Sequence, residues 1–198
     1  GSGQMVGEKT TRASQRTIRA LRNEYGIGTR QIAASMRGPK QVLSLAGTDV
    51  LTMPCEVARG FQDMKPESSE VRDRVNEDPS PGIDDEVDPV ETGLHHLWAV
   101  PEQLKKLCAD IRQRGDATLQ PEELQDMLEE QGLGDILPRW TEEHRDVVRS
   151  DGKIPVYENW QEEIQNGDIG LDALMTLSGL YAFVTDQQAL DERIESLL

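Results

Sequence analysis

Residues 29–53, which read TRQIAASMRGPKQVLSLAGTDVLTM, decide the fold class of this chain. The stretch begins over residues 29–35 with small and apolar side chains, which are typical of a buried parallel strand. Gly38-Pro39 ends that strand, and proline suits the first turn of the helix that follows. A second apolar run covers residues 49–53. Two strands joined by a short helix indicate a βα unit of a parallel sheet.

Helices are expected on both sides of this stretch. Ser14 is a candidate N-cap for a helix that ends near Tyr25, and the apolar residues of 57–64 recur at helical spacing. The expected order over residues 11–65 is therefore α-β-α-β-α. Residues 1–10 are interpreted as an expression-tag remnant with a disordered start.

The second part of the chain has a different composition. Residues 66–93 hold four prolines, ten acidic residues and no aromatic residue, so we expect an acidic linker with too little apolar surface to order itself. Helical spacing returns from residue 94, and no strand is expected in residues 94–198. The helices expected toward the end of the chain cover 141–148, 157–164, 171–182 and 186–197. Thr141 with His144 and Thr185 with Gln188 have the spacing of helix caps.

Charge is unevenly distributed along the chain. Residues 1–64 hold nine Lys/Arg and five Asp/Glu, a net charge of +4, whereas the remainder holds twelve and thirty-two, a net charge of −20. Such an acidic chain is a poor candidate for binding nucleic acid or an anionic membrane. No apolar run approaches the ~20 residues of a membrane span. We expect a cytoplasmic protein.

Few residues have the spacing of metal ligands. Cys55 and Cys108 are far apart in sequence, which favours two reduced thiols. His95 and His96 are adjacent, so on a helix their side chains should diverge, and His144 has no metal-binding motif around it. No metal site and no cofactor are expected.

Two segments run in step with the calcium loop of an EF-hand, Arg112–Glu123 and Val147–Glu158. Calcium needs oxygen ligands at the first and third loop positions. Those positions hold Arg112 and Arg114 in the first segment and Val147 and Arg149 in the second. Ordinary helix–turn–helix pairs with glycine-bearing turns are therefore expected.

Ser35 and Arg37 are the candidate binding residues, for the phosphate of a substrate. They follow the first expected strand, and in stacked βα units binding groups gather at the carboxyl ends of strands. In an extended segment, side chains two residues apart leave on the same face. A hydroxyl, a guanidinium and the start of the helix at Pro39 would together suit an anion. A surface arginine beside a serine turn is the alternative.

The segment from Tyr25 to Met64 resembles the seventh and eighth βα units of transaldolases and of the related fructose-6-phosphate aldolases. The matching pieces are "AAS-R" at the strand end, "QVLSLAG-D" in the helix and "LTMP" in the last strand. The later "LDALMTLSGLYAFVTDQQALDERI" is similar to the final helices of that family. The two regions cover about 65 residues, a third of the chain, in the order of the family.

The resemblance implies a class I aldolase fold. The fold class is then α/β plus α: the closing βα units of a TIM (β/α)8 barrel, with two parallel strands, followed by a mostly helical C-terminal region over residues 94–198. Members of the family transfer a dihydroxyacetone unit between sugar phosphates, in the pentose phosphate pathway, through a lysine Schiff base and without a metal. Ser35 and Arg37 would hold the phosphate. The family usually has Phe and Asn where this chain has Met36 and Gly38.

The Schiff-base lysine of the family lies on earlier strands of the barrel. No lysine of this chain lies in an apolar strand, where burial could depress the pKa of the amine. We therefore expect no catalytic residue here, and this chain alone should be inactive. The expected partners are a sugar phosphate and either the N-terminal half of the barrel or a second copy. The alternative function is a non-catalytic interaction module with an acidic helical surface. The six lysines are Lys9, Lys40, Lys65, Lys105, Lys106 and Lys153.

Overall fold

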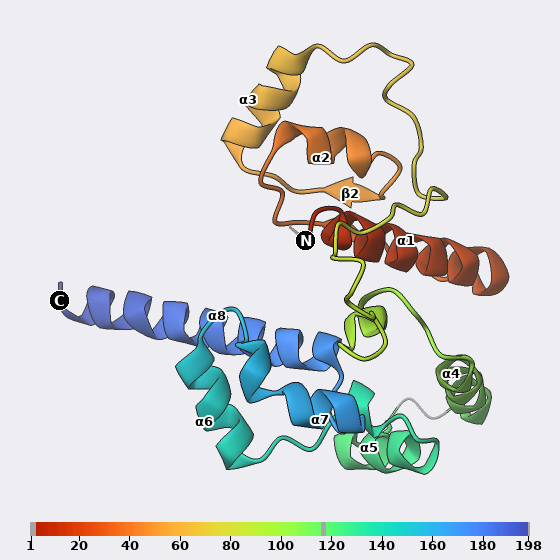
Figure 1. Ribbon diagram of the computed structural model, residues 1–198, viewed down its shortest axis with the longest axis vertical. Helices are drawn as coiled ribbons and strands as arrows, with labels where there is room; N and C mark the ends of the chain where they lie inside the picture. Colours follow the sequence, from red (N-terminus) through yellow and green to blue (C-terminus); the bar gives the residue numbers. More distant parts are fainter. Residues whose placement is uncertain (1–2, 116–117, 198) are drawn as a thin grey trace. The chain divides into compact units, whose positions relative to one another are not determined.

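The computed structural model describes residues 3–115 and 118–197. The chain divides into two compact units, with the boundary between Val87 and Asp88 (Figure 1). None of the helices formed by the described residues combines the length and the apolarity that a bilayer span requires.

The first unit contains both strands. Its apolar core forms where α2 and α3 pack against the strands, and the buried residues of this core are Ala33, Met36, Val42, Leu45 and Val57. The elements in chain order are α1 (Val6–Tyr25), β1 (Ile32–Ala33), α2 (Pro39–Ser44), β2 (Val50–Leu51) and α3 (Cys55–Met64).

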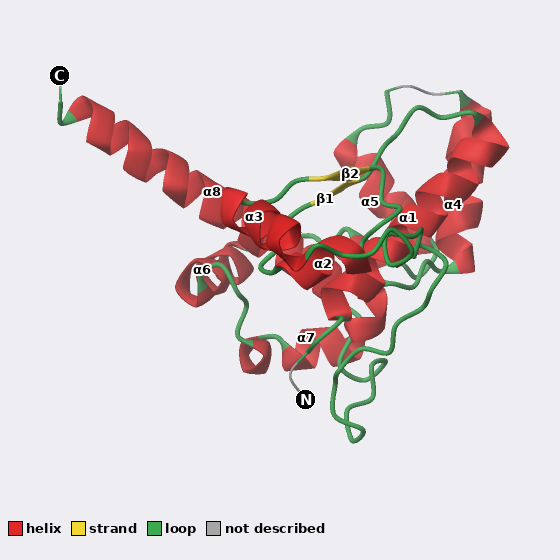
Figure 2. Ribbon diagram, turned by 90° about the horizontal axis from the view of Figure 1, so that it is seen from above, coloured by secondary structure: helices red, strands yellow, loops and turns green. Residues whose placement is uncertain are grey.

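The two strands form a parallel pair, and Figure 2 shows them side by side. Ile32 lies opposite Val50, and Ala33 opposite Leu51. Each strand is two residues long, much shorter than the apolar run that contains it. No third strand among the described residues pairs with either of them. The Ile32 side chain is 61% exposed, whereas Ala33 is 3% exposed. One side of this small sheet is therefore packed and the other is open.

Helix α1 begins at Val6, eight residues before the expected N-cap Ser14. The expectation of a disordered start over residues 1–10 is wrong for the residues that the structure describes there. Gln4 forms an antiparallel bridge with Gly82, in which the Gly3 N–H donates to the Gly82 carbonyl over 2.9 Å. The first turns of α1 were missed because their buried side chains are charged.

The buried face of α1 is polar. Arg12 is 3% exposed, and its guanidinium donates to the Ser44 carbonyl from Nε over 2.9 Å. Gln15 is fully buried and donates to the Asp49 carboxylate over 3.0 Å. Buried polar groups cost free energy unless they are hydrogen-bonded. The buried Arg12 and Gln15 side chains both form hydrogen bonds. Hydrogen bonds, rather than apolar contacts alone, therefore attach α1 to the end of α2 and to the residue before β2.

Residues 66–87 belong to the first unit, so the expected linker is wrong over this range. Val75 is 1% exposed. Asp73 pairs with Arg19 of α1 over 2.8 Å, and Asp78 pairs with Lys9 over 2.6 Å. The acidic side chains that suggested disorder are instead the partners of basic residues on α1.

The second unit consists of helices. Two apolar cores hold it together, one around Leu107, Leu128 and Leu133 and the other around Trp160 and Leu174. The elements are η1 (Leu94–Leu97), α4 (Glu102–Arg114), α5 (Pro121–Glu130), η2 (Gly134–Ile136), α6 (Glu142–Asp151), η3 (Tyr157–Asn159), α7 (Gln161–Asn166) and α8 (Leu171–Glu195).

Trp160 is the largest fully buried side chain of the second unit. Its indole N–H donates to Asp151 Oδ2 over 2.8 Å. The same carboxylate accepts hydrogen bonds from the Val156 N–H over 3.0 Å and from the Asn159 amide over 2.7 Å. Asp151 thereby closes the loop between α6 and η3. Trp140 lies edge-on to Trp160, with 6.4 Å between the ring centroids.

A single helix, α8, replaces the two helices expected over 171–182 and 186–197. Thr185 does not cap a helix, because its hydroxyl donates to the Tyr181 carbonyl within α8 over 3.0 Å. Thr141 does cap α6: its side chain accepts from the His144 N–H over 3.1 Å. Both threonines have the spacing of a cap, so spacing alone does not locate a helix end.

Candidate functional site

The candidate site is an open hollow at the carboxyl ends of both strands. The loop after β1 contributes Ser35, Met36 and Arg37, and the segment after β2 contributes Pro54, Glu56 and Val57. The hollow has a volume of about 420 Å³. Small-molecule sites in proteins have volumes of ~300–1,000 Å³, and in parallel βα folds they lie at this end of the strands.

The backbone turns sharply at Ser35. Its φ is +60°, a left-handed conformation that is uncommon for residues other than glycine. The expectation of an extended segment through Ser35 and Arg37 is therefore wrong, since β1 ends at Ala33. The turn directs Met36 into the core, where it is 3% exposed, and leaves the side chains on either side of it at the surface. Both predicted residues line the same hollow.

The loop after β1 is held by its own hydrogen bond. The Arg37 N–H donates to the Gln41 side-chain oxygen over 2.7 Å, and the Gln41 amide donates to Glu8 of α1 over 3.1 Å. Gln41 lies on α2, so α1 and α2 together fix the position of the Arg37 backbone. The Arg37 guanidinium forms no ion pair with any described residue. It is available for an anion.

Two opposite charges border the hollow. Arg37 enters from the loop after β1, and Glu56 enters from the first turn of α3. Both residues are exposed, and within the described chain they do not pair with each other. Helix α2 has only six residues, so its N-terminus adds little to the local field, and the guanidinium is the main attraction for an anion.

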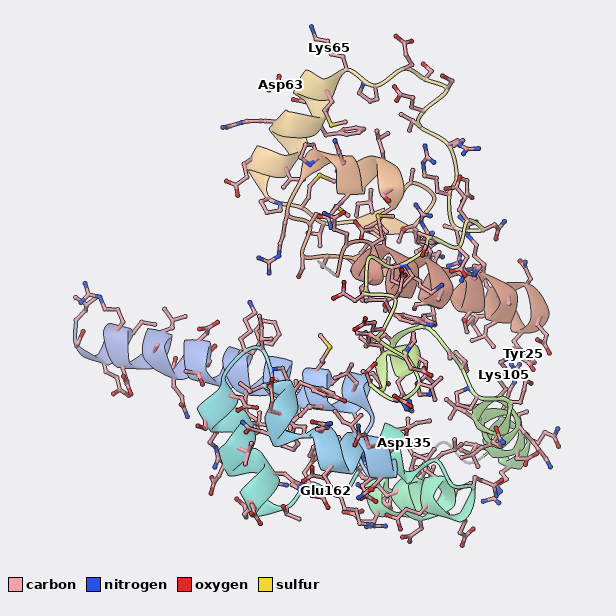
Figure 3. All side chains as sticks on the ribbon, in the orientation of Figure 1. Tyr25, Asp63, Lys65, Lys105, Asp135 and Glu162 are labelled. Atoms are coloured by element: carbon pink, nitrogen blue, oxygen red, sulfur yellow. The ribbon has the colours of Figure 1, made fainter. Side chains whose placement is uncertain are left out.

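None of the six lysines lies on a strand. Lys9 is on α1, Lys40 on α2 and Lys153 in the turn after α6, while Lys65 ends α3 and Lys105 lies on α4 (Figure 3). Lys106 also lies on α4. These positions offer no apolar barrel interior in which an amine could be desolvated.

A second cluster of titratable side chains lies in the second unit and was not found from the sequence. His96 Nδ1 lies 3.3 Å from Asp135 Oδ2. Burial raises the pKa of the nearby Asp172 carboxyl, and its Oδ1 has no hydrogen-bond partner among the described residues. The three residues come from η1, η2 and the first turn of α8, too far apart in sequence to form a motif. Figure 3 labels Asp135.

The two adjacent histidines do not diverge as expected. They lie in the 3₁₀ helix η1, where the rings of His95 and His96 have centroids 4.1 Å apart and planes tilted by 45°. In residues 3–115 and 118–197, no three His, Cys, Asp or Glu side chains come together as a metal site. Part of the first calcium-loop segment, residues 116–117, lies outside the described residues. Cys55 and Cys108 are both free and exposed.

Comparison with known proteins identified no relative. No family model, no curated protein and no solved structure matches this chain.

Proposed function

We propose that this chain is the C-terminal portion of a transaldolase-like enzyme, which transfers a dihydroxyacetone unit between sugar phosphates through a lysine Schiff base. Ser35 and Arg37 would bind the substrate phosphate, and the lysine would come from elsewhere. One observation carries the proposal: the residues that sequence analysis selected for phosphate binding line one hollow at the carboxyl ends of two parallel strands. The Arg37 guanidinium has no other ion-pair partner in the described chain to compete with a phosphate.

The proposed partner is the N-terminal half of the barrel or a second copy of this chain. The incomplete sheet of the first unit supports this proposal. β1 and β2 each have one edge without a strand partner in the described residues, and the Ile32 and Val50 side chains are exposed on the open face of the sheet. Parallel sheets are usually covered on both faces, so further elements are needed to complete this one.

The test measures binding of fructose 6-phosphate to the intact chain by NMR titration. Arg37→Ala should weaken binding by about 1.5–3 kcal/mol, the range for a hydrogen bond to a charged group. Arg37→Lys should recover part of the loss, because lysine lacks the two-pronged guanidinium. The wild type should bind unphosphorylated fructose more weakly than fructose 6-phosphate. The two Arg37 variants should bind unphosphorylated fructose with the same low affinity as each other.

Arg30→Ala is the matched control. Arg30 is exposed and precedes β1, so it lies at the opposite end of the strand from the hollow. It should leave the affinity for fructose 6-phosphate unchanged. Equal affinities of the wild type and Arg37→Ala would exclude the phosphate site, and the proposed function with it.

The alternative function, a non-catalytic module that binds partners through an acidic helical surface, has support in α8. Beyond Ala182 this helix is exposed on all sides, and the acidic residues exposed there are Asp186, Asp191, Glu192 and Glu195. The same titration separates the two functions, because an interaction module should not distinguish fructose 6-phosphate from fructose.

A further inference from the structure

Glu56 lines the same hollow as Ser35 and Arg37, and the role derived for it below rests on the proposed function. The hollow brings together two charges of opposite sign that come from different elements and do not form an ion pair with each other. A guanidinium and a carboxylate at a surface would gain from pairing directly, although the gain is small. Because both line one hollow without an ion pair between them, they suit a ligand that has an anionic group at one end and hydrogen-bond donors at the other.

The size of the hollow also suits a ligand larger than a phosphate ion. Its volume of about 420 Å³ is more than a phosphate group alone occupies, and falls within the ~300–1,000 Å³ of small-molecule sites. A ligand anchored by its phosphate at Ser35 and Arg37 has room for a carbon chain. That chain would extend toward the segment after β2, where Glu56 is the charged residue that lines the hollow.

An ionised carboxylate accepts hydrogen bonds and cannot donate them. Sugar hydroxyl groups can donate to it, and a hydrogen bond to a charged acceptor is stronger than one between neutral groups. A bare phosphate ion offers Glu56 little but a like charge, which is repelled. The same side chain should therefore favour one ligand and disfavour the other.

We propose that Glu56 is a specificity residue, which selects phosphorylated polyols over inorganic phosphate by accepting hydrogen bonds from their hydroxyl groups. Stabilisation of the first turn of α3 accounts for an acidic residue at this position but predicts no such preference. The two roles make different predictions for ligand binding.

The experiment measures the dissociation constants of fructose 6-phosphate and of inorganic phosphate for the intact wild type and for Glu56→Gln. Glutamine keeps the shape of the side chain and removes its charge. We expect Glu56→Gln to weaken the binding of fructose 6-phosphate by about 3–10-fold, because a charged acceptor is lost. We expect it to strengthen the binding of inorganic phosphate by about 2–5-fold, because a repulsive charge is lost. The ratio of the two constants is the decisive quantity.

Asp63→Asn is the matched control, because it makes the same charge change at the other end of α3 (Figure 3). Asp63 is exposed and lies seven residues from Glu56, about 10 Å along a helix. It should leave the ratio at the wild-type value. Melting temperatures of both variants show whether α3 is retained.

Two failures can be told apart. If Arg37→Ala binds fructose 6-phosphate as tightly as the wild type, the phosphate site itself is absent and the proposed function fails. If Arg37→Ala loses binding while Glu56→Gln keeps the wild-type ratio, only the role of Glu56 is overturned. The role of Glu56 would also be overturned if the dissociation constants of both ligands changed in the same direction by the same factor, since a remote charge has that effect.

Discussion

At the scale of single residues, Asp49 is a carboxylate that accepts hydrogen bonds from three other residues of the first unit. It accepts from Arg22 over 2.6 Å, from Gln15 over 3.0 Å and from the Gln31 N–H over 3.1 Å. These bonds, with that from Arg22 the largest cause, hold the pKa of Asp49 well below its usual range. Asp49 therefore joins α1 to both strands, since Gln31 precedes β1 and Asp49 precedes β2.

Asp49→Asn should lower the stability of the protein in a pH-dependent way. A carboxylate with a depressed pKa stabilises the folded state fully above its unfolded pKa of ~3.9, and this contribution is lost as the pH falls toward the folded pKa. The wild type should therefore be more stable than Asp49→Asn at pH 7, and the difference should shrink below about pH 4. Urea unfolding between pH 3 and 7 measures it. A difference that does not change with pH would show that the charge of Asp49 is unimportant.

At the scale of elements, Gly47 determines how the segment after α3 packs. Its φ is +101°, and a Cβ at this position would overlap the Asp73 carboxylate and approach Val75 Cγ2 to 3.1 Å. The glycine thus permits the segment of Asp73 and Val75 to approach the turn before β2 closely.

Gly47→Ala should destabilise the first unit by about 1–3 kcal/mol, the cost of an unfavourable backbone conformation, and displace Val75 from its buried position. Thermal unfolding measures the loss, and hydrogen exchange at residues 73–78 shows whether the segment has detached. Gly28→Ala is the control, because a Cβ on Gly28 meets no atom within 4 Å. Equal melting temperatures for the two variants would contradict the packing described for Gly47.

Apolar periodicity locates the elements of this chain whose buried faces are apolar. The helices around Val57, Leu107 and Leu128 could be placed in this way. Periodicity fails where the interior is polar. Glu8 and Arg12 are buried but have the sequence pattern of surface residues, so the eight residues of α1 before Ser14 were missed. It also fails for Asp73 and Asp78, whose order depends on basic partners more than 50 residues away.

The candidate site was only partly predictable. Ser35 and Arg37 could be selected because they follow the first strand. In βα units, binding residues gather in the loops at the carboxyl ends of the strands. The left-handed turn at Ser35 has no signal in the sequence, since serine does not require it. Glu56 was not selected, because an acidic residue in the first turn of a helix is ordinary and gives no sign of a site. The structure places it in the same hollow as Ser35 and Arg37.

At the scale of the whole molecule, the chain has two units with separate cores. Leu174 of α8 is fully buried in the second unit. Leu174→Ala should lower the free energy of unfolding of that unit by about 2–5 kcal/mol, the cost of a cavity in a core. Hydrogen exchange should show faster exchange in α6 and α8, while residues 32–57 keep wild-type protection.

Leu180→Ala is the control for this prediction, since Leu180 lies on the same helix but is 57% exposed. It should change stability little. If Leu174→Ala accelerated exchange equally in both units, the chain would unfold as one cooperative body.

The aromatic residues of the two units give each unit a different optical signal. All three tryptophans, Trp98, Trp140 and Trp160, belong to the second unit. The first unit has no tryptophan, and its tyrosine is Tyr25. Indole emission from this protein therefore reports on the helical unit alone, and on Trp160 beside Asp151 in particular. A denaturation curve recorded by tryptophan fluorescence leaves the unit that carries Ser35, Arg37 and Glu56 unobserved, whereas a backbone signal records both units.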